Sequence, residues 1–285
     1  MNRSDFRFFD RLRVRWAEVD MQHIVFNAHY LMYCDTAVAG YWRALALPYQ
    51  TTMQALQGDL FVRKATLEYE GSARYDDQLQ VGIRCGRIGN SSMVLHAAVL
   101  RGDQRLVHGE LVYVFADPAT QKSKPVPAAL RELFEKFEAG AAVLDVKVGA
   151  WQTLADGAQS VRRAVFVEEQ KIPAAMVVDD HDREALHAVV HNHFGLPVAS
   201  GRLLAIAPAI SQIGRMATLA GLRGAGLGQA VLTALLEAAR ERGDTEVLLH
   251  AQAAAVPFYR RYGFVCSGVE FVEAGLQHIE MRRRP

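Results

Sequence analysis

The sequence predicts a two-domain α+β chain, in which an antiparallel sheet wrapped around one central helix precedes a mixed α/β domain. Three observations support this fold class. The chain has 285 residues, which is too long for one typical core and suits two domains. Its first half has the pattern of one strand, one apolar helix and then a run of strands. Its second half mixes helices and strands around a glycine-rich turn.

The composition is that of a soluble globular protein. Hydrophobic residues make up 51% and charged residues 22%. The net charge of +1 gives no global field for nucleic acid or membrane, so local groups must hold any anionic ligand. The sequence has no signal peptide and no apolar run of membrane-spanning length, so we expect a cytoplasmic protein. Cys34, Cys85 and Cys266 lie far apart without metal-like spacing, and we expect buried thiols and no metal site.

The first domain is expected at residues 1–138. Residues 6–19 alternate between apolar and polar types, which predicts a strand. Residues 28–45 carry apolar side chains over most of a helical surface, which predicts a central, buried helix. A short terminal helix is expected at 125–137. The further expected strands are 60–69, 78–86, 93–100 and 106–116.

A junction of small residues at 139–147 precedes the second domain, expected at 148–285. We expect Ser160 to cap a helix that runs through Val167, and the longest helical pattern is 226–242. The remaining expected elements are strands at 186–191, 197–207, 213–219 and 247–250, a short helix at 256–262 and a hairpin at 264–281.

Residues 18–30 are similar to the active-site signature of the 4-hydroxybenzoyl-CoA thioesterase family, in its YbgC-like branch. In that family an Asp precedes an Ile/Val-Val-aromatic run and a Tyr near the start of the central helix, as Asp20, 24–26 and Tyr30 do here. Residues 67–77 resemble the strand–turn element of the same family. The resemblance implies a hot-dog fold that hydrolyses acyl-CoA thioesters.

The resemblance implies that Asp20 is the nucleophile or base and that the backbone amide of Asn27 polarises the thioester carbonyl. A carboxylate can attack the carbonyl or activate water, and the first N–H groups of a helix can hold the oxyanion. The alternative is that Asp20 is only a helix cap or a surface carboxylate. Two positions depart from the family, which often has Gly at His23 and an aromatic residue or His at Asn27.

Other polar residues of this half have simpler interpretations. His23 and His29 are expected on a loop and a helix surface rather than in catalysis. Asp35 is expected in a salt bridge or facing solvent, and Arg63 and Lys64 as a solvated pair rather than ligands of CoA phosphates. Because hot-dog folds pair their sheets, we expect a homo-oligomer, a dimer or tetramer.

A strand, a glycine-rich turn and a long helix follow one another at 213–228. The glycines of the turn, Gly224, Gly226 and Gly228, let the backbone approach a pyrophosphate, which successive N–H groups and the helix start can bind. The spacing alone also fits a dinucleotide fingerprint. That motif usually opens the first βαβ unit of a domain, whereas this turn lies late in its domain.

With Arg223 in front of it, the turn resembles the acetyl-CoA signature of the GNAT superfamily, Arg/Gln-x-x-Gly-x-Gly/Ala. Residues 252–264 are similar to the helix that follows in that superfamily, and 161–170 and 271–281 resemble its ElaA-like branch. The resemblance implies transfer of an acetyl or other acyl group from CoA to an amine. Acetyl-CoA or another acyl-CoA is then a substrate, and no covalently bound cofactor is expected.

The resemblance also implies roles for single residues. Tyr259 would protonate the departing thiolate, with Tyr262 as a competitor that more plausibly packs. The general base stays open among Glu168, Glu169 and His250. The residues expected to bind CoA are Met216, Ala217, Thr218, Arg223, Gly224, Ala225, Gly226, Leu227 and Gly228.

Three histidines, His187, His191 and His193, alternate along one predicted strand. Without a Cys or carboxylate partner, they are expected on a polar strand face rather than around a metal. The leading hypothesis is a bifunctional acyl-CoA enzyme whose partners are small-molecule acyl-CoA and an amine. We expect it to bind neither nucleic acid nor a membrane. The alternative is that one half is a non-catalytic dimerisation or CoA-binding module that supports the other.

Overall fold

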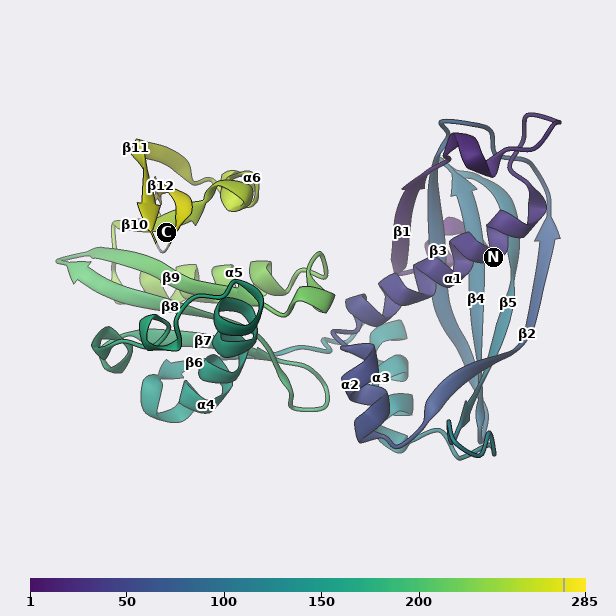
Figure 1. Ribbon diagram of the computed structural model, residues 1–285, viewed down its shortest axis with the longest axis horizontal. Helices are drawn as coiled ribbons and strands as arrows, with labels where there is room; N and C mark the ends of the chain where they lie inside the picture. Colours follow the sequence, from purple (N-terminus) through teal and green to yellow (C-terminus); the bar gives the residue numbers. More distant parts are fainter. Residues whose placement is uncertain (274) are drawn as a thin grey trace. The chain divides into compact units, whose positions relative to one another are not determined.

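The chain forms two compact units, Met1–Val143 and Leu144–Pro285, each with its own sheet (Figure 1). This computed structural model describes residues 1–273 and 275–285, so Ala274, in the stretch 271–281, lies outside the described residues. Both sheets carry helices, and the predicted two-domain α+β class is confirmed. Within the described ranges, no helix is long and apolar enough to cross a membrane.

The first unit is an antiparallel sheet in the order β1-β3-β4-β5-β2, which curves around α1 (Asn27–Ala44) (Figure 1). Two shorter helices, α2 (Tyr49–Ala55) and α3 (Ala128–Glu138), complete it. Tyr41 of α1 is fully buried. The arrangement is the predicted hot-dog fold. Its strands are β1 (Phe8–Arg13), β2 (Asp59–Tyr69), β3 (Gln78–Ile88), β4 (Ser92–Arg101) and β5 (Gln104–Ala116).

Two features of this unit differ from expectation. The strand expected at 6–19 ends at Arg13, because its partner β3 begins opposite at Gln78 and offers no further backbone to pair with. A short 3-10 helix, Trp16–Glu18, follows instead. In addition, α1 is buried on one face only, and its Leu31 and Met32 are exposed.

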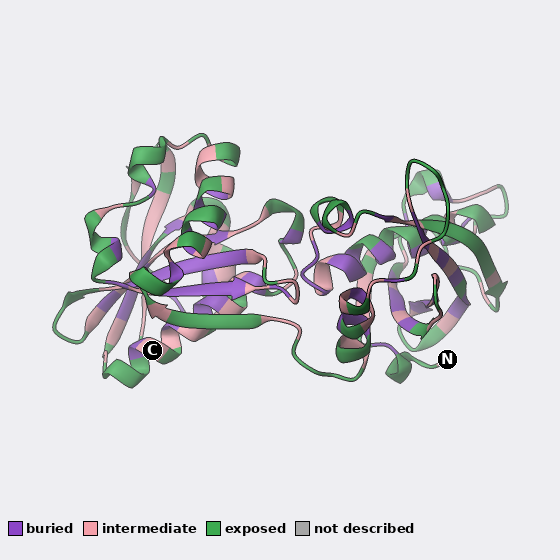
Figure 2. Cartoon of the chain, turned by 90° about the horizontal axis from the view of Figure 1, so that it is seen from below, coloured by how far each residue is buried: buried purple, intermediate pink, exposed green. Residues whose placement is uncertain are grey.

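The second unit is a seven-stranded mixed sheet in the order β11-β12-β10-β9-β8-β7-β6. Its helices are α4 (Trp151–Arg162), which continues as a π-helix (Arg163–Glu169), α5 (Leu227–Arg242) and α6 (Val256–Arg261). Figure 2 shows the buried residues gathered along the central strands and the helix faces that cover them. The strands are β6 (Asp145–Ala150), β7 (Leu186–His191), β8 (Pro197–Ala207), β9 (Ile210–Thr218), β10 (Glu246–Gln252), β11 (Val265–Glu273) and β12 (Leu276–Arg283).

Three expectations about this unit need correction. The junction expected at 139–147 is shorter, because β6 pairs with β7 from Asp145 onward. Ser160 does not cap a helix but lies inside α4, whose buried residues Leu154, Ala158 and Val161 repeat at helical spacing. Cys34 and Cys85 are buried as expected, but Cys266 is exposed because β11 is the edge strand of its sheet.

Candidate functional site

Asp20 lies in a tight loop between the 3-10 helix Trp16–Glu18 and α1. Val19 and Val25 form an isolated antiparallel bridge, and the Asp20 N–H donates to the carbonyl of Ile24 at 2.9 Å. The loop therefore folds back on itself. It returns the chain to the side of Asp20 just before α1 begins at Asn27.

The start of α1 is left open for a ligand. The residue before it, Phe26, provides no side-chain cap, although the first N–H groups of a helix have no partner within the helix. Asn27 and Ala28 are both exposed, and the hydroxyl of Tyr69 donates to the Asn27 carbonyl at 3.2 Å. The Asp20 carboxylate accepts from the Gln22 N–H at 2.8 Å within its own turn, and the loop leads from there to the first amides of α1.

His23 is a turn residue of this loop. It has a φ of 61°, in the left-handed region that favours glycine. The family often has Gly at this position, and a side chain there costs about 1–2 kcal/mol in backbone strain. His23 is exposed and lies on the loop, where the sequence analysis expected it.

Glu18 holds this loop in place through hydrogen bonds of its buried carboxylate. The sequence analysis did not single it out. Its carboxylate is only 3% exposed and accepts hydrogen bonds from the Tyr33 hydroxyl and the Arg15 amide, both at 2.8 Å. Burial alone would raise the pKa of Glu18, but the Arg15 amide, the Tyr33 hydroxyl and the Arg15 guanidinium lower it below its usual value. In the sequence, the only feature that could have drawn attention to Glu18 is its position two residues before Asp20.

The surroundings of Asp20 are apolar and open to solvent. Soluble monomers seldom expose several large apolar side chains in one region. Around the loop and the start of α1, the exposed ones are Trp16 (73%), Met21 (97%), Phe26 (49%), Tyr69 (52%) and Tyr75 (55%). Asp35 is exposed on α1 and accepts from the Tyr113 hydroxyl at 3.3 Å, and Arg63 and Lys64 are exposed on β2.

In the second unit, β9 and β10 run parallel but pair over only part of their length. The pairing joins Ile210 through Ile213 to Glu246 through Leu249, whereas β9 continues to Thr218 and β10 to Gln252. The two strands therefore separate beyond Leu249. Their facing backbone groups are free to bind an extended ligand between them.

A β-bulge in β9 lies at this point of separation. The register with β8 shifts between Gly214 and Ala217, and Arg215 has a φ of 53°. Bulges and left-handed non-glycine residues cost free energy and cluster at functional sites. Met216 follows the bulge and lines a pocket, Ala217 is buried, and Thr218 ends the strand.

The glycine-rich turn before α5 faces open space. Gly224 and Gly226 have φ values of 85° and 82°, and a Cβ atom at either would meet nothing within 4 Å. Gly226 is the N-cap residue and provides no side-chain hydrogen bond, while Leu227 is buried and anchors the helix. Arg223 forms two hydrogen bonds of 2.7 Å with Glu169.

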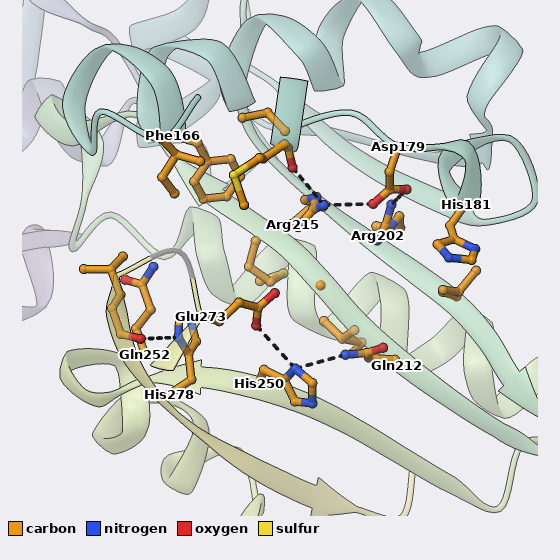
Figure 3. Close-up of a pocket in the computed structure, with 18 of the residues that line it drawn as sticks. Phe166, Asp179, His181, Arg202, Gln212, Arg215, His250, Gln252, Glu273 and His278 are labelled. Carbon is orange, nitrogen blue, oxygen red and sulfur yellow. Dashed lines mark hydrogen bonds and ion pairs between the residues drawn. The ribbon is translucent and has the colours of Figure 1, made fainter. Parts of the chain in front are cut away.

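A pocket of about 750 Å³ lies beside the separated strands (Figure 3). Tyr259 of α6 lines it and is 8% exposed, and burial raises the pKa of its hydroxyl to about 12. Tyr259 and Tyr262 both pack against Phe258, each with ring centroids 5.0 Å apart, but Tyr262 is not part of the pocket lining.

Of the three candidate bases, His250 lines the pocket. Its Nδ1 lies 3.6 Å from a carboxylate oxygen of Glu273, and its Nε2 lies 3.9 Å from one of Glu280 (Figure 3 labels His250 and Glu273). Glu168 pairs with Arg163 on the π-helix and Glu169 pairs with Arg223, so both lie outside the pocket lining.

A chain of alternating charges runs from the buried Arg162 and Asp182 to one wall of the pocket, where Arg202, Asp179 and Arg215 line it. Arg162 donates to both carboxylate oxygens of Asp182 at 2.9 and 3.0 Å, and Arg202 donates to the same carboxylate at 3.0 Å. Arg202 also donates to Asp179 at 2.5 Å, and Arg215 donates to the other oxygen of Asp179 at 2.8 Å. Sequence reasoning missed this cluster.

The histidine prediction is wrong at His187. This residue is fully buried rather than on a polar strand face, with Nδ1 3.2 Å from Arg162 and Nε2 2.8 Å from the Asp182 carbonyl. His191 shares β7 with it, whereas His193 lies in the turn beyond the strand. Across residues 1–273 and 275–285, no three His, Cys, Asp or Glu side chains gather as a metal site.

Burial and pairing act in opposite directions on this cluster. Burial alone would raise the pKa of Asp182, but Arg162, the Asp179 amide and Arg202 lower it below its usual value. Burial lowers the pKa of Arg162 against the pull of Asp182, yet an arginine stays charged. Asp182 therefore stabilises the fold above its ordinary pKa, and this stabilisation is lost as the pH falls through the lowered value.

Comparisons with known proteins separate the two units. Residues 162–285 match the family described as "Acetyltransferase (GNAT) domain", and residues 14–134 match the "Thioesterase-like superfamily". The uncharacterized N-acetyltransferase YjcF of Bacillus subtilis is 37% identical over 124 residues, 43% of this chain and 87% of YjcF. The uncharacterized protein YyaT of the same species is 33% identical over 129 residues, 44% and 86% of the two chains. The acyl-CoA thioester hydrolase YbgC of Escherichia coli O6:H1 is 26% identical over 140 residues, 48% and 100%.

The first prediction concerns the buried charges. Asp182→Asn removes one of two carboxylates that face three arginines, so the free energy of unfolding of the second unit should fall by about 3–5 kcal/mol. Chemical denaturation followed by tryptophan fluorescence measures this, because Trp151 packs against His187. Asp145→Asn, at an exposed pair with Lys147, is the matched control and should change stability by less than about 1 kcal/mol. Equal effects of the two changes would contradict the account.

Proposed function

Because the second half of the chain belongs to the GNAT acetyltransferase family and the first half is a thioesterase-like hot-dog domain, we propose that the protein is a bifunctional acyl-CoA enzyme. The first unit hydrolyses an acyl-CoA thioester, and the second transfers an acetyl or other acyl group from CoA to an amine. One observation carries the proposal. In each unit a helix start lies beside the groups that the chemistry needs, the Asp20 loop before α1 and the open turn of Gly224 and Gly226 before α5.

In the first unit, Asp20 acts on the thioester carbonyl. Its carboxylate attacks the carbonyl carbon, or it takes a proton from a water that attacks. The N–H at Asn27 holds the developing oxyanion, a contribution of roughly 3–4 kcal/mol in similar sites. When the carboxylate attacks, the C–S bond breaks as an Asp20–acyl anhydride forms, and water then hydrolyses this anhydride; when water attacks, the C–S bond breaks directly. In both routes the acyl group leaves as a carboxylate, and of the two protons of the consumed water one ends on the CoA thiol and the other in solvent. Glu18 and His23 keep the loop in the shape that this requires.

We propose that the first unit works as a homo-oligomer. Strand β2 lies at one edge of the sheet, and its Phe61 and Val62 are exposed, as are Leu31 and Met32 on α1. An unpaired edge with apolar side chains favours pairing with another chain. A second copy on this edge would cover these residues and help to enclose the acyl group beside Asp20.

In the second unit, acyl-CoA lies between the separated ends of β9 and β10. Backbone groups near Met216 and Thr218 bind the pantetheine arm, and the amides from Arg223 to Gly228 bind the diphosphate. The amine attacks the acyl carbonyl, the C–S bond breaks, and Tyr259 gives its proton to the leaving thiolate.

The protonation states of the second site fit this order of events. With a pKa of about 12, Tyr259 holds its proton at neutral pH. A thiol in the same apolar surroundings also has a raised pKa, so the pKa values of the CoA thiol and the Tyr259 phenol become more similar. His250, close to Glu273 and Glu280, accepts the proton of the amine, directly or through water.

We propose a cytoplasmic location for the enzyme. All three cysteines are free thiols, as expected in a reducing compartment. Acyl-CoA and an amine are the proposed small-molecule partners.

The second prediction tests the hydrolase site. Asp20→Asn keeps the shape of the side chain but removes the attacking or proton-accepting charge, so acyl-CoA hydrolysis should fall by about a hundredfold or more. Thiol release from a panel of acyl-CoAs measures it. Asp103→Asn, on an exposed turn of the same unit, should leave the rate unchanged. Hydrolysis near the wild-type rate in Asp20→Asn would show that the site is elsewhere.

The third prediction tests the transferase acid. Tyr259→Phe removes only the proton donor, so acyl transfer to amines should slow by about ten- to a hundredfold, while CoA affinity should change little. Mass spectrometry of the acylated amine gives the rate, and calorimetry gives the affinity. The matched variant Tyr262→Phe should transfer at the wild-type rate. Equal turnover in the two variants would assign Tyr259 to packing.

A further inference from the structure

The alternating chain of charges ends in the pocket. Its order is Arg162, Asp182, Arg202, Asp179 and Arg215, so it begins and ends on an arginine. Three guanidinium groups share two carboxylates, which leaves one positive charge in excess. His187 adds no positive charge because burial lowers its pKa.

The excess charge is accessible only at one end. The Arg162 side chain is completely buried, Arg202 is 10% exposed and Arg215 is 26% exposed. Arg202 and Arg215 both line the pocket. A ligand in the pocket therefore meets the unbalanced charge at Arg215.

Arg215 also has hydrogen-bond donors to spare. Its Nη2 donates to Asp179 at 2.8 Å and to the Met176 carbonyl at 3.1 Å. Its Nε is buried and no described residue accepts from it, so the Nη1 group is the donor that a ligand in the pocket can reach. The strained φ of 53° sets this side chain on the pocket wall at the bulge.

The neighbouring carboxylates do not cancel this charge. Each oxygen of Asp179 already accepts from an arginine, Oδ1 from Arg202 and Oδ2 from Arg215. Glu184 lines the pocket as well, but among the described residues it forms no ion pair with either arginine.

A second polar group of the same pocket contains a histidine and carboxylates in place of arginines. His250 of β10 lies near Glu273 of β11 and Glu280 of β12. In Figure 3, His250 and Glu273 lie apart from Arg215 and Asp179. This group suits an ammonium that must lose a proton. Apolar side chains occupy much of the remaining lining: Phe166, Ile172, Leu204, Ile206, Met216 and Leu276.

We propose that the acceptor amine also carries a carboxylate and an apolar body, as a hydrophobic amino acid does, and that Arg215 binds this carboxylate. The inference rests on the proposed acyl transfer and names the substrate class of that same site. The amine lies toward His250 and the carboxylate lies at Arg215. With Nη2 bonded to Asp179 and Met176 and Nε buried, Nη1 is the nitrogen that can donate charge-assisted hydrogen bonds to this carboxylate.

Matched acceptors test the proposal in the full-length protein with acetyl-CoA. The acceptors are L-leucine, L-phenylalanine and L-methionine, their carboxamides, and phenethylamine as an amine without a carboxylate. The acetylated product is measured by mass spectrometry, so that hydrolysis in the first unit does not contribute. Wild type should prefer each acid over its amide by about ten- to a hundredfold in kcat/KM, the range that one charge-assisted hydrogen bond gives.

Two variants of Arg215 identify the cause of the preference. Arg215→Gln should raise KM for the acids, reduce the acid-to-amide ratio to about one and leave the amides unaffected. Arg215→Lys keeps a positive charge and should retain part of the preference. CoA affinity, measured by calorimetry, should be the same in all three proteins.

Three results would overturn the inference while leaving acyl transfer intact. One is equal use of acids and amides by wild type, and another is an unchanged ratio in Arg215→Gln. The third is weaker CoA binding in Arg215→Gln with no change in the ratio, which would assign Arg215 to the phosphates of CoA. Acetylation of no acceptor of any kind would instead contradict the transferase proposal, and this inference with it.

Discussion

The uncapped helix start is the constraint on which both sites depend. The first N–H groups of any helix lack partners within it, and most helices satisfy them with a capping side chain. None of the α-helices in the described residues has a side-chain cap, so α1 and α5 differ from the others only in what lies beside their starts. The first N–H groups of these two helices are open to water or to an external acceptor, and a negatively charged oxygen is the acceptor that the helix dipole favours.

The surrounding structure keeps these helix starts in place. In the first unit the bridge between Val19 and Val25 and the buried Glu18 carboxylate hold the loop against α1. In the second unit the buried Leu227 holds the first turn of α5, and the incomplete pairing of β9 with β10 leaves room beside it. Strain at His23 and Arg215 is the cost of these shapes, and the packed cores offset it.

Local patterns in the sequence predicted most elements and the candidate residues that lie near helix starts. The glycine-rich turn was predictable because its backbone requires φ values that only glycine adopts easily. The charge chain was not, because Arg162, Asp182 and Arg202 come from an α-helix, a short 3-10 helix and a strand that tertiary packing joins. The same reason hid β6, whose pairing with β7 cannot be read from six mostly exposed residues. Ser160 was misassigned because a capping residue type was given more weight than the spacing of Leu154, Ala158 and Val161.

Amide hydrogen exchange at residues 223–228, with and without CoA, tests the central claim most directly. The account predicts that CoA slows exchange at this turn in the wild-type protein. The slowing should persist in Gly243→Glu, which adds the same charge at a left-handed glycine at the far end of α5, and vanish in Gly226→Glu. The account is contradicted if CoA leaves exchange at the turn unchanged. It is also contradicted if CoA slows this exchange in Gly226→Glu as much as in the wild-type protein.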